Sequence, residues 1–189
     1  MLHSVSVGMN LGSNSSEIRT NRLLLRRFSL EDMDAYAAIM GDDEVMRWFP
    51  NGKGYTREQA KKSLDIILDH WVKHGFGIWA VTDKDSGVLL GRCGLNLIAE
   101  TSEVEVDFVI ARNYWRHGYA TEAARAALAY GFDVLKLDRI IALAKPDNVA
   151  SRRVIEKIGM HYVKDAEYWG IICAFFEVTK PHYINQLRM

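Results

Sequence analysis

The segment from Glu103 to Leu128 constrains the fold of this 189-residue chain more than any other part of it. It begins with EVEVDFVIA, whose alternation is typical of a strand with two unlike faces. One face would carry Val104, Val106, Phe108 and Ile110, and the other Glu103, Glu105, Asp107 and Val109. The turn NYWRHGY and the alanine-rich pattern ATEAARAAL follow at once. A strand, a turn and a helix in direct succession predict an α/β protein.

Other patterns predict further elements around this unit. Strands are expected at residues 22–28, 77–83, 88–98, 139–145, 160–170 and 171–180. Helices are expected at residues 29–41, 56–75 and 150–159, and from the turn to about residue 136. Ser29 with Asp32, and Thr56, are suitable helix caps, while Gly75 ends the second helix. We therefore expect a mixed sheet, largely antiparallel at its ends and crossed by helices in the middle.

Composition and charge narrow the class of protein. Residues 1–16 are rich in Ser, Asn and Gly and are expected to form a flexible N-terminal extension, with residues 17–189 as a single domain. Hydrophobic residues make up 49% and charged residues 25%, which suits a soluble globular protein. The balance of 24 basic and 24 acidic residues argues against a nucleic-acid partner. No apolar run approaches the ~20 residues of a membrane helix, so no membrane partner is expected.

Cysteines and histidines give no sign of a disulfide framework or a metal centre. Cys93 and Cys173 lie far apart and are expected as buried thiols in a reducing cytoplasm. No ligand spacing links His3, His70, His74, His161 and His182, so no metal is expected. The first residues also make a poor signal peptide, which favours a cytoplasmic location.

The turn before the alanine-rich helix has the features of a phosphate site. The first turn of a helix has unpaired N–H donors and the positive end of the helix dipole. Gly118 would let a ligand approach the backbone, Ala120 is small, and Arg116 and His117 could add charge. The pattern is neither Gly-x-Gly-x-x-Gly nor a nucleotide P-loop. Alternatively, the glycine only makes the corner.

Four stretches in order, IRTNRLLLRRFSLEDMDAY, DDEVMRWFP, YWRHGYATEA and NVASRRVIEKIGM, carry a resemblance to a known family. The chain resembles the GNAT superfamily of acetyl-coenzyme A-dependent N-acetyltransferases, and within it the branch of the ribosomal-protein alanine N-acetyltransferases. The resemblance covers roughly residues 18–187. It implies a mixed, mostly antiparallel central sheet flanked by helices and splayed at the acetyl-CoA site.

The resemblance also implies which residues bind acetyl-CoA. The turn would hold the pyrophosphate and pantetheine through Arg116, His117, Gly118, Tyr119, Ala120 and Thr121. The strand before it would bulge and splay from residues 139–145, with backbone contacts to the pantetheine from Val109, Ile110 and Ala111. Asn148 would hydrogen-bond the coenzyme, cap the following helix, or do both.

The expected reaction needs a base, an oxyanion donor and help for the leaving thiolate. The resemblance suggests Glu105 as the base, although a carboxylate paired to an arginine is the alternative; Asp107 and Glu103 are weaker candidates. A backbone N–H near Val109 would bind the oxyanion. Ile155 stands where many members have a tyrosine acid, and Ser151 is the suggested substitute, since some relatives in this branch use a serine there; it could also only cap a helix.

The acceptor site would be built from residues 42–55 and the closing hairpin, with Trp48 and Phe49 lining it. The acidic residues of that loop, Asp42, Asp43 and Glu44, could attract a cationic amine or form only a solvated surface. The predicted partners are acetyl-CoA and a primary amine, either a protein N-terminal α-amine or a small molecule, with the enzyme a monomer or homodimer. Alternatives are a non-catalytic CoA-binding regulatory module and a nucleotide-phosphate binder.

Overall fold

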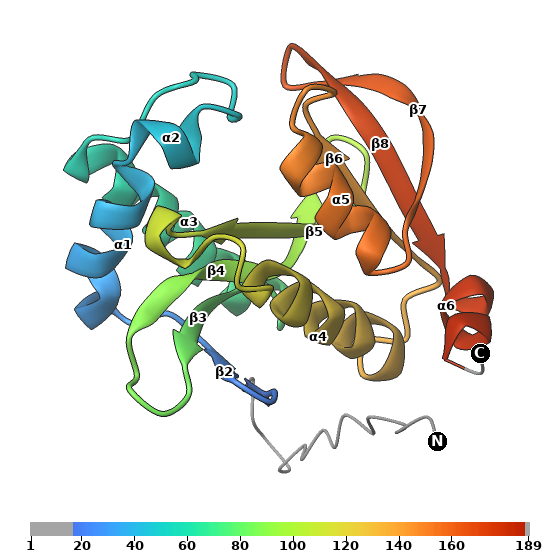
Figure 1. Ribbon diagram of the computed structural model, residues 1–189, viewed down its shortest axis with the longest axis horizontal. Coiled ribbons are helices and arrows are strands. Elements are labelled where there is room, and N and C mark those ends of the chain that lie inside the picture. Colours follow the sequence, from blue (N-terminus) through green and yellow to red (C-terminus); the bar gives the residue numbers. More distant parts are fainter. Residues whose placement is uncertain (1–16, 188–189) are drawn as a thin grey trace.

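Within residues 17–187, the part of the chain that the computed structural model describes, eight strands form one sheet (Figure 1). The strands are β1 (Ile18–Arg19), β2 (Leu23–Arg26), β3 (Ile78–Asp83), β4 (Leu89–Ile98), β5 (Glu103–Ile110), β6 (Arg139–Ala144), β7 (His161–Tyr168) and β8 (Ile171–Thr179). Their order is β1-β2-β3-β4-β5-β6-β8-β7. Of the neighbouring pairs, β5 and β6 are parallel and the others antiparallel. The predicted mixed sheet is confirmed; the predicted extension over residues 1–16 lies outside the described residues.

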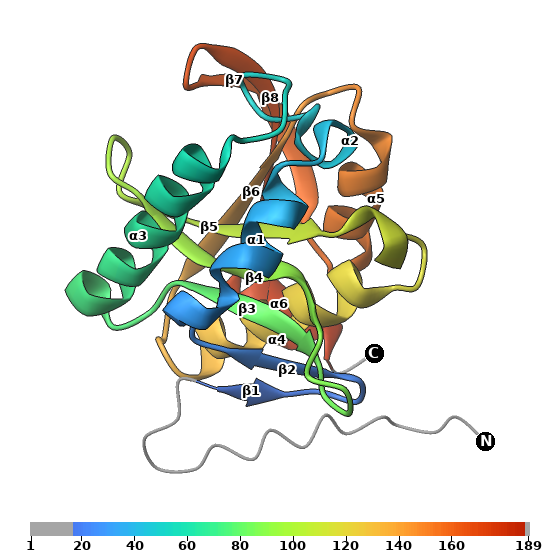
Figure 2. The same cartoon turned by 90° about the vertical axis from the view of Figure 1, so that its left-hand side faces the viewer.

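Helices cover both faces of this sheet. They are α1 (Met33–Met40), α2 (Asp43–Met46), α3 (Arg57–His74), α4 (Tyr119–Asp133), α5 (Val149–Lys157) and α6 (Lys180–Gln186). In Figures 1 and 2, α4 and α5 lie on one side of the sheet and α3 on the other. Three alanines of α4, Ala123, Ala124 and Ala127, are fully buried, and Gly131 lies against Leu95 and Ile140. These small side chains let α4 approach the sheet closely.

Local signals placed most helix ends correctly. Ser29 and Asp32 form a capping box at a 3-10 turn that leads into α1, and Thr56 with Gln59 forms another at α3. Gly75 ends α3 in the left-handed conformation, with φ of 72°. Two short elements, β1 and α6, were not predicted, and α4 ends at Asp133 rather than near residue 136.

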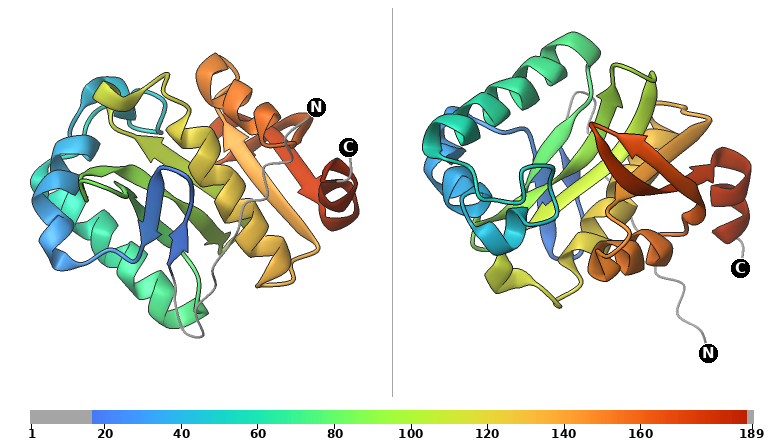
Figure 3. Two further views of the ribbon diagram at one scale, coloured as in Figure 1. Left: turned by 60° about the horizontal axis from the view of Figure 1, so that its bottom comes forward. Right: turned by 90° about the horizontal axis from the view of Figure 1, so that it is seen from above.

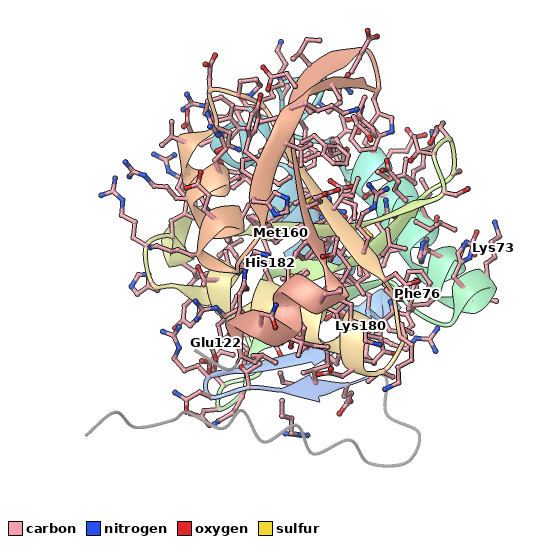
Figure 4. The ribbon with its side chains drawn as sticks, turned by 90° about the vertical axis from the view of Figure 1, so that its right-hand side faces the viewer. Lys73, Phe76, Glu122, Met160, Lys180 and His182 are labelled. Atoms are coloured by element: carbon pink, nitrogen blue, oxygen red, sulfur yellow. The ribbon has the colours of Figure 1, made fainter. Side chains whose placement is uncertain are left out.

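The last helix, α6, closes the C-terminal side of the described chain. Gln186 Nε2 donates to the Gly159 carbonyl at 2.8 Å, which ties α6 to the turn before β7. The ring of Tyr183 stacks on Phe132 of α4, with 4.7 Å between centroids. Figure 4 looks onto this side and labels His182 on α6 and Met160 just before β7. Because these contacts join segments far apart in sequence, no local sequence pattern predicts them.

The sheet opens between β5 and β6. The pairing of β4 with β5 runs without interruption from Gly91 and Ile110 to Ile98 and Glu103. By contrast, within residues 17–187 β5 and β6 are in register at a single pair, Glu105 and Ile141. Figures 1 and 3 show the two strands diverging from each other. The predicted splay is confirmed, whereas the predicted bulge is wrong because the register of β5 against β4 is continuous.

Candidate active site

The turn before α4 exposes the start of that helix. Gly118 is the N-cap residue, with φ of 82°, and Arg116 also has a positive φ of 65°. No side chain caps this helix, so the first N–H groups of α4 remain available to a ligand. A side chain at position 118 would be strained and would point toward Arg22, whose Nη2 would lie 3.5 Å from the added Cβ. The local geometry agrees with an anion site at the helix dipole's positive end.

Two contacts that the sequence did not predict hold this turn. Arg22 Nη1 donates to the His117 carbonyl at 2.9 Å, and Arg22 Nη2 lies 2.7 Å from Glu122 Oε2. Burial raises the pKa of Glu122, but hydrogen bonds from Thr20 and Arg22 outweigh it, so the pKa is below its usual value. Since Arg22 and Glu122 are 100 positions apart in the chain, nothing local linked them.

Backbone directions along β5 decide which groups face the gap. The Ala111 N–H donates to the Leu90 carbonyl at 2.8 Å. Because hydrogen-bonded pairs alternate along an antiparallel ladder, the Val109 N–H also points to β4. The N–H groups of Phe108 and Ile110 therefore point the other way, toward the gap beside β6. The Ile110 carbonyl accepts from Trp115 Nε1 at 2.7 Å, which fixes the strand end against the turn.

A cavity of about 340 Å³ lies beside the gap. Five predicted residues line it: Glu105, Ser151, Asn148, Trp48 and Phe49. Asp107 of β5, a weaker candidate for the base, also lines it. Further lining residues come from α3, β4, the end of β6, the β7–β8 turn and β8, among them His70, Arg92, Lys145, Trp169 and Cys173. The structure thus brings the predicted catalytic and acceptor residues together in one cavity, whose floor is the face of β5 that carries the acidic residues.

Glu105 is a buried carboxyl group with 8% of its surface exposed. Burial raises its pKa well above the usual value and the charge of Asp107 adds to this, while Arg92 and the Leu143 N–H oppose it. The alternative of an arginine-paired Glu105 is not what the structure shows, because Arg92 Nη2 pairs with Asp107 Oδ2 at 2.8 Å. Glu105 is therefore the carboxyl group of this cavity that is suited to accept a proton.

Ser151 and Asn148 form a reciprocal pair at the start of α5. Asn148 Oδ1 accepts from the Ser151 N–H at 3.2 Å, and Asn148 Nδ2 donates to Ser151 Oγ at 2.9 Å. The serine oxygen therefore accepts one hydrogen bond and its own proton is left to donate. Ile155, at the position of the family's tyrosine, is 1% exposed and belongs to the core. The capping role of Asn148 is confirmed.

The loop on the acceptor side is held by its own contacts. Asp42 caps α2 by accepting from the Glu44 N–H at 2.8 Å, and Asp43 accepts from the Gly54 N–H at 2.8 Å. Glu44 pairs with Arg47 at 3.0 Å. None of these three acidic residues is among those that line the cavity, so their local roles explain them. The aromatic pair Trp48 and Phe49, in contrast, reaches it.

Two negative observations apply to residues 17–187. No group of three or more His, Cys, Asp or Glu side chains in that part of the chain could hold a metal ion. None of its helices is both long and apolar enough to cross a bilayer. Cys93 and Cys173 are free, buried thiols, as predicted.

The sheet opens beside an uncapped helix start, with a buried carboxyl in the adjoining cavity, which is the arrangement that the resemblance to acyltransferases using coenzyme A implies. Residues 22–161 match the acetyltransferase (GNAT) domain family, and the chain belongs to that family. It is therefore an acetyl-CoA-dependent N-acetyltransferase.

Relatives and solved structures agree with this assignment. The uncharacterized protein YkkB of Bacillus subtilis (strain 168) is 34% identical over 167 residues, covering 86% of this chain and 95% of that protein. The uncharacterized N-acetyltransferase YnaD of the same organism is 36% identical over 143 residues, covering 76% and 81%. The crystal structure of an acetyltransferase (GNAT family) from Bacillus anthracis has a TM-score of 0.76 at 27% identity, covering 87% of this chain and 99% of that one.

Proposed function

We propose that this N-acetyltransferase acetylates the α-amine of a protein N-terminus and that Glu105 is its general base. The observation that carries the proposal is the position of Glu105, which is buried, lines the cavity and is paired with Ile141 of β6 where the two strands are in register. A carboxyl whose pKa is raised by burial can take a proton near neutral pH. An amine in the cavity would then lie between this base and a thioester in the gap.

The turn and the gap supply acetyl-CoA binding in this proposal. The first N–H groups of α4, over residues 118–121, would bind the pyrophosphate, with Arg116 and His117 adding charge. The Ile110 N–H points into the gap where the pantetheine would pair with β5. Asn148, which lines the cavity, would contact the same arm.

The chemistry follows from the same placements. The neutral amine nitrogen attacks the thioester carbon, the C–N bond forms and the C–S bond breaks, and Glu105 takes the amine's proton directly or through water. The Phe108 N–H is the donor that faces the gap and would bind the oxyanion, in place of the Val109 N–H. Ser151 would give its hydroxyl proton to the leaving thiolate and regain one from solvent.

The acceptor class rests on the resemblance to the ribosomal-protein branch and on the aromatic lining by Trp48 and Phe49. A cytoplasmic location belongs to the same proposal and is supported by the two free thiols. The competing function is a CoA-binding module without turnover. The presence of Ile155 in place of a tyrosine favours this alternative.

Thiol release measured with a panel of N-terminal peptides and small amines, alongside a titration of acetyl-CoA, tests the proposal. We expect turnover with peptides that have a free α-amine and none with the same peptides blocked at that amine. Binding of acetyl-CoA without turnover on any amine would favour the module. Faster turnover on small amines lacking an amino-acid unit would refute the acceptor class.

A further inference from the structure

The charged groups of the cavity are not those of a site for a purely cationic acceptor. Its acidic lining residues are Glu105 and Asp107, and its basic ones are Arg92 and Lys145. Lys145 Nζ is 3.4 Å from the Phe49 carbonyl and ties the acceptor loop to the end of β6. With two acidic and two basic groups, this lining has no net negative charge to attract a polyamine.

Arg92 is the less expected of the two. It lies opposite Val109 in the β4–β5 pairing, on the same sheet face as Asp107 and Glu105. Its side chain is 11% exposed, and its Nη2 pairs with Asp107 Oδ2 at 2.8 Å. Its Nε is buried and has no hydrogen-bond partner. Because Nε is buried, an oxygen in the cavity would meet the terminal amino groups of the guanidinium. A guanidinium has five N–H donors, and the contact of Nη2 with Asp107 leaves other N–H groups to donate to a further oxygen.

The spacing along β5 suits one small chemical unit. Asp107, which holds the guanidinium, lies two residues from Glu105, so the Cα atoms of these two residues are roughly 7 Å apart along the strand. In an α-amino acyl unit the nitrogen and the carbonyl oxygen are about 3 Å apart, and a hydrogen bond of about 2.9 Å extends from each. Such a unit can bridge the base and the guanidinium, whereas an isolated amine can reach only one of them.

We infer that the acceptor carries a carbonyl or carboxylate oxygen next to its amine, and that Arg92 binds this oxygen while the amine lies at Glu105. The inference rests on the proposed function of the cavity as the acceptor site. Asp107 is the positioning residue that holds the guanidinium over the cavity floor. Arg92 thereby selects α-amino acyl compounds, whether free amino acids or the first residue of a peptide.

A matched series of ligands tests the oxygen directly. Leucinamide represents a peptide end, leucine a free amino acid, and 4-methyl-2-aminopentane has a methyl group in place of the carbonyl unit. Dissociation constants are measured by calorimetry in the presence of coenzyme A, and kcat/KM with acetyl-CoA, corrected for the neutral fraction of each amine. We expect the better of the two oxygen-bearing ligands to exceed the third by about 10-fold or more, the effect of one hydrogen bond to a charged group.

Two variants assign the preference to Arg92. The double variant Arg92→Met with Asp107→Asn removes the pair without leaving a buried charge alone. Arg92→Lys keeps the charge and loses the planar fork, so it tests the inference even if the double variant does not fold. The double variant should bring the ratio close to one, and Arg92→Lys should lower the ratio, while the Kd for acetyl-CoA stays the same in both. The control is Arg26→Met with Asp32→Asn, an ion pair of 2.6 Å outside the cavity, which should keep the ratio.

The outcomes separate this inference from the proposed function. Equal binding across the series in the wild-type protein, or a preference that survives both Arg92 variants, overturns the inference even if amines are acetylated. A preference that disappears in the variants supports it even if none of the three ligands is turned over, in which case the proposed function fails instead. Tighter binding of leucine than of leucinamide assigns the site to free amino acids, and the reverse to peptide ends.

Discussion

Replacing Glu105 by Gln is the sharpest test of the base, because a base and a structural carboxyl predict opposite changes. The substitution keeps the shape and removes the proton acceptor. If the base acts in the slow step, kcat should fall by roughly 10²–10⁴-fold. The Kd for acetyl-CoA should hardly change, because the proposed function assigns that binding to the turn at residues 115–121. The loss should be smaller at high pH, where more of the acceptor amine is already neutral.

The pH dependence has a definite sign. Burial raises the pKa of Glu105 above its usual value, so the wild-type rate should fall as the pH decreases, with an apparent pKa above the ~4.3 of a free glutamate. The rate of Glu105→Gln should lack that acidic limb. A pH–rate profile from single-turnover measurements on both proteins checks this directly.

Glu105→Gln should stabilise the protein near neutral pH, whereas the loss of an ion pair would destabilise it. The folded-state pKa of Glu105 lies above the unfolded value, so its contribution to stability is full below pH ~4.3 and is lost as the pH rises through the raised pKa. A tenfold difference in proton affinity between the folded and unfolded states corresponds to about 1.4 kcal/mol, and 1 kcal/mol changes the Tm of a domain of this size by about 2–4 °C. We therefore expect Glu105→Gln to raise the Tm near neutral pH and to leave it nearly unchanged at pH 4.

The matched control is Glu103→Gln on the same strand face. Glu103 pairs with Arg139 at 2.7 Å and accepts from the Tyr168 hydroxyl at 2.7 Å. This variant should lower the Tm and keep turnover per folded molecule. If Glu105→Gln behaves in the same way, with an unaltered pH profile, the reasoning is refuted, and Asp107 or a backbone-held water becomes the base.

Three further predictions concern the turn, the serine and a histidine. Gly118→Val should lower the Tm and weaken acetyl-CoA binding several-fold, because a side chain would obstruct the helix start. The control Gly75→Val, also at a positive φ but with open space around it, should lower the Tm alone. Equal Kd values for acetyl-CoA in the wild-type protein and Gly118→Val would contradict the assignment. Ser151→Ala should reduce single-turnover rates modestly with coenzyme affinity intact, and full turnover would make Ser151 only a capping partner. Burial lowers the pKa of His70, whose ring nitrogens make hydrogen bonds with the Phe76 carbonyl and the Leu97 N–H. The contribution of His70 to stability is therefore full above pH ~6.5 and is lost as the pH falls through the lowered pKa. The Tm of His70→Leu should depend less on pH between about 5 and 7 than the wild-type Tm, and an unchanged slope would exclude this role.

The elements that were predictable are those whose signals are local. The alternation in EVEVDFVIA, the caps at Ser29 and Thr56 and the glycine at position 75 each act within a few residues. β1 has two residues and α6 has seven, too few for periodicity to appear. The gap beside β5 followed only from the family resemblance, because a missing strand pairing leaves no mark on either strand's own pattern.

The sequence allowed the residues of the site to be predicted, but not which of them form ion pairs with one another. Glu105, Asn148, Ser151, Trp48 and Phe49 were expected and line one cavity. Which carboxyl Arg92 would neutralise depends on the β4–β5 register, which places Arg92 opposite Val109 and Gly94 opposite Asp107. A shift of that register would change the partner, and no single-strand pattern determines it.

That pairing is what gives the three carboxyls of β5 different properties. Glu103 is tied to Arg139 and Tyr168, and these contacts hold the pKa of Glu103 below its usual value despite partial burial. Asp107 is tied to Arg92. Glu105 lies between them, buried and opposite the neutral Asn96, and Ile141 is its neighbour across the parallel pair. Because both flanking carboxyls already have cationic partners, the middle one is the group whose protonation can follow the state of an amine in the cavity.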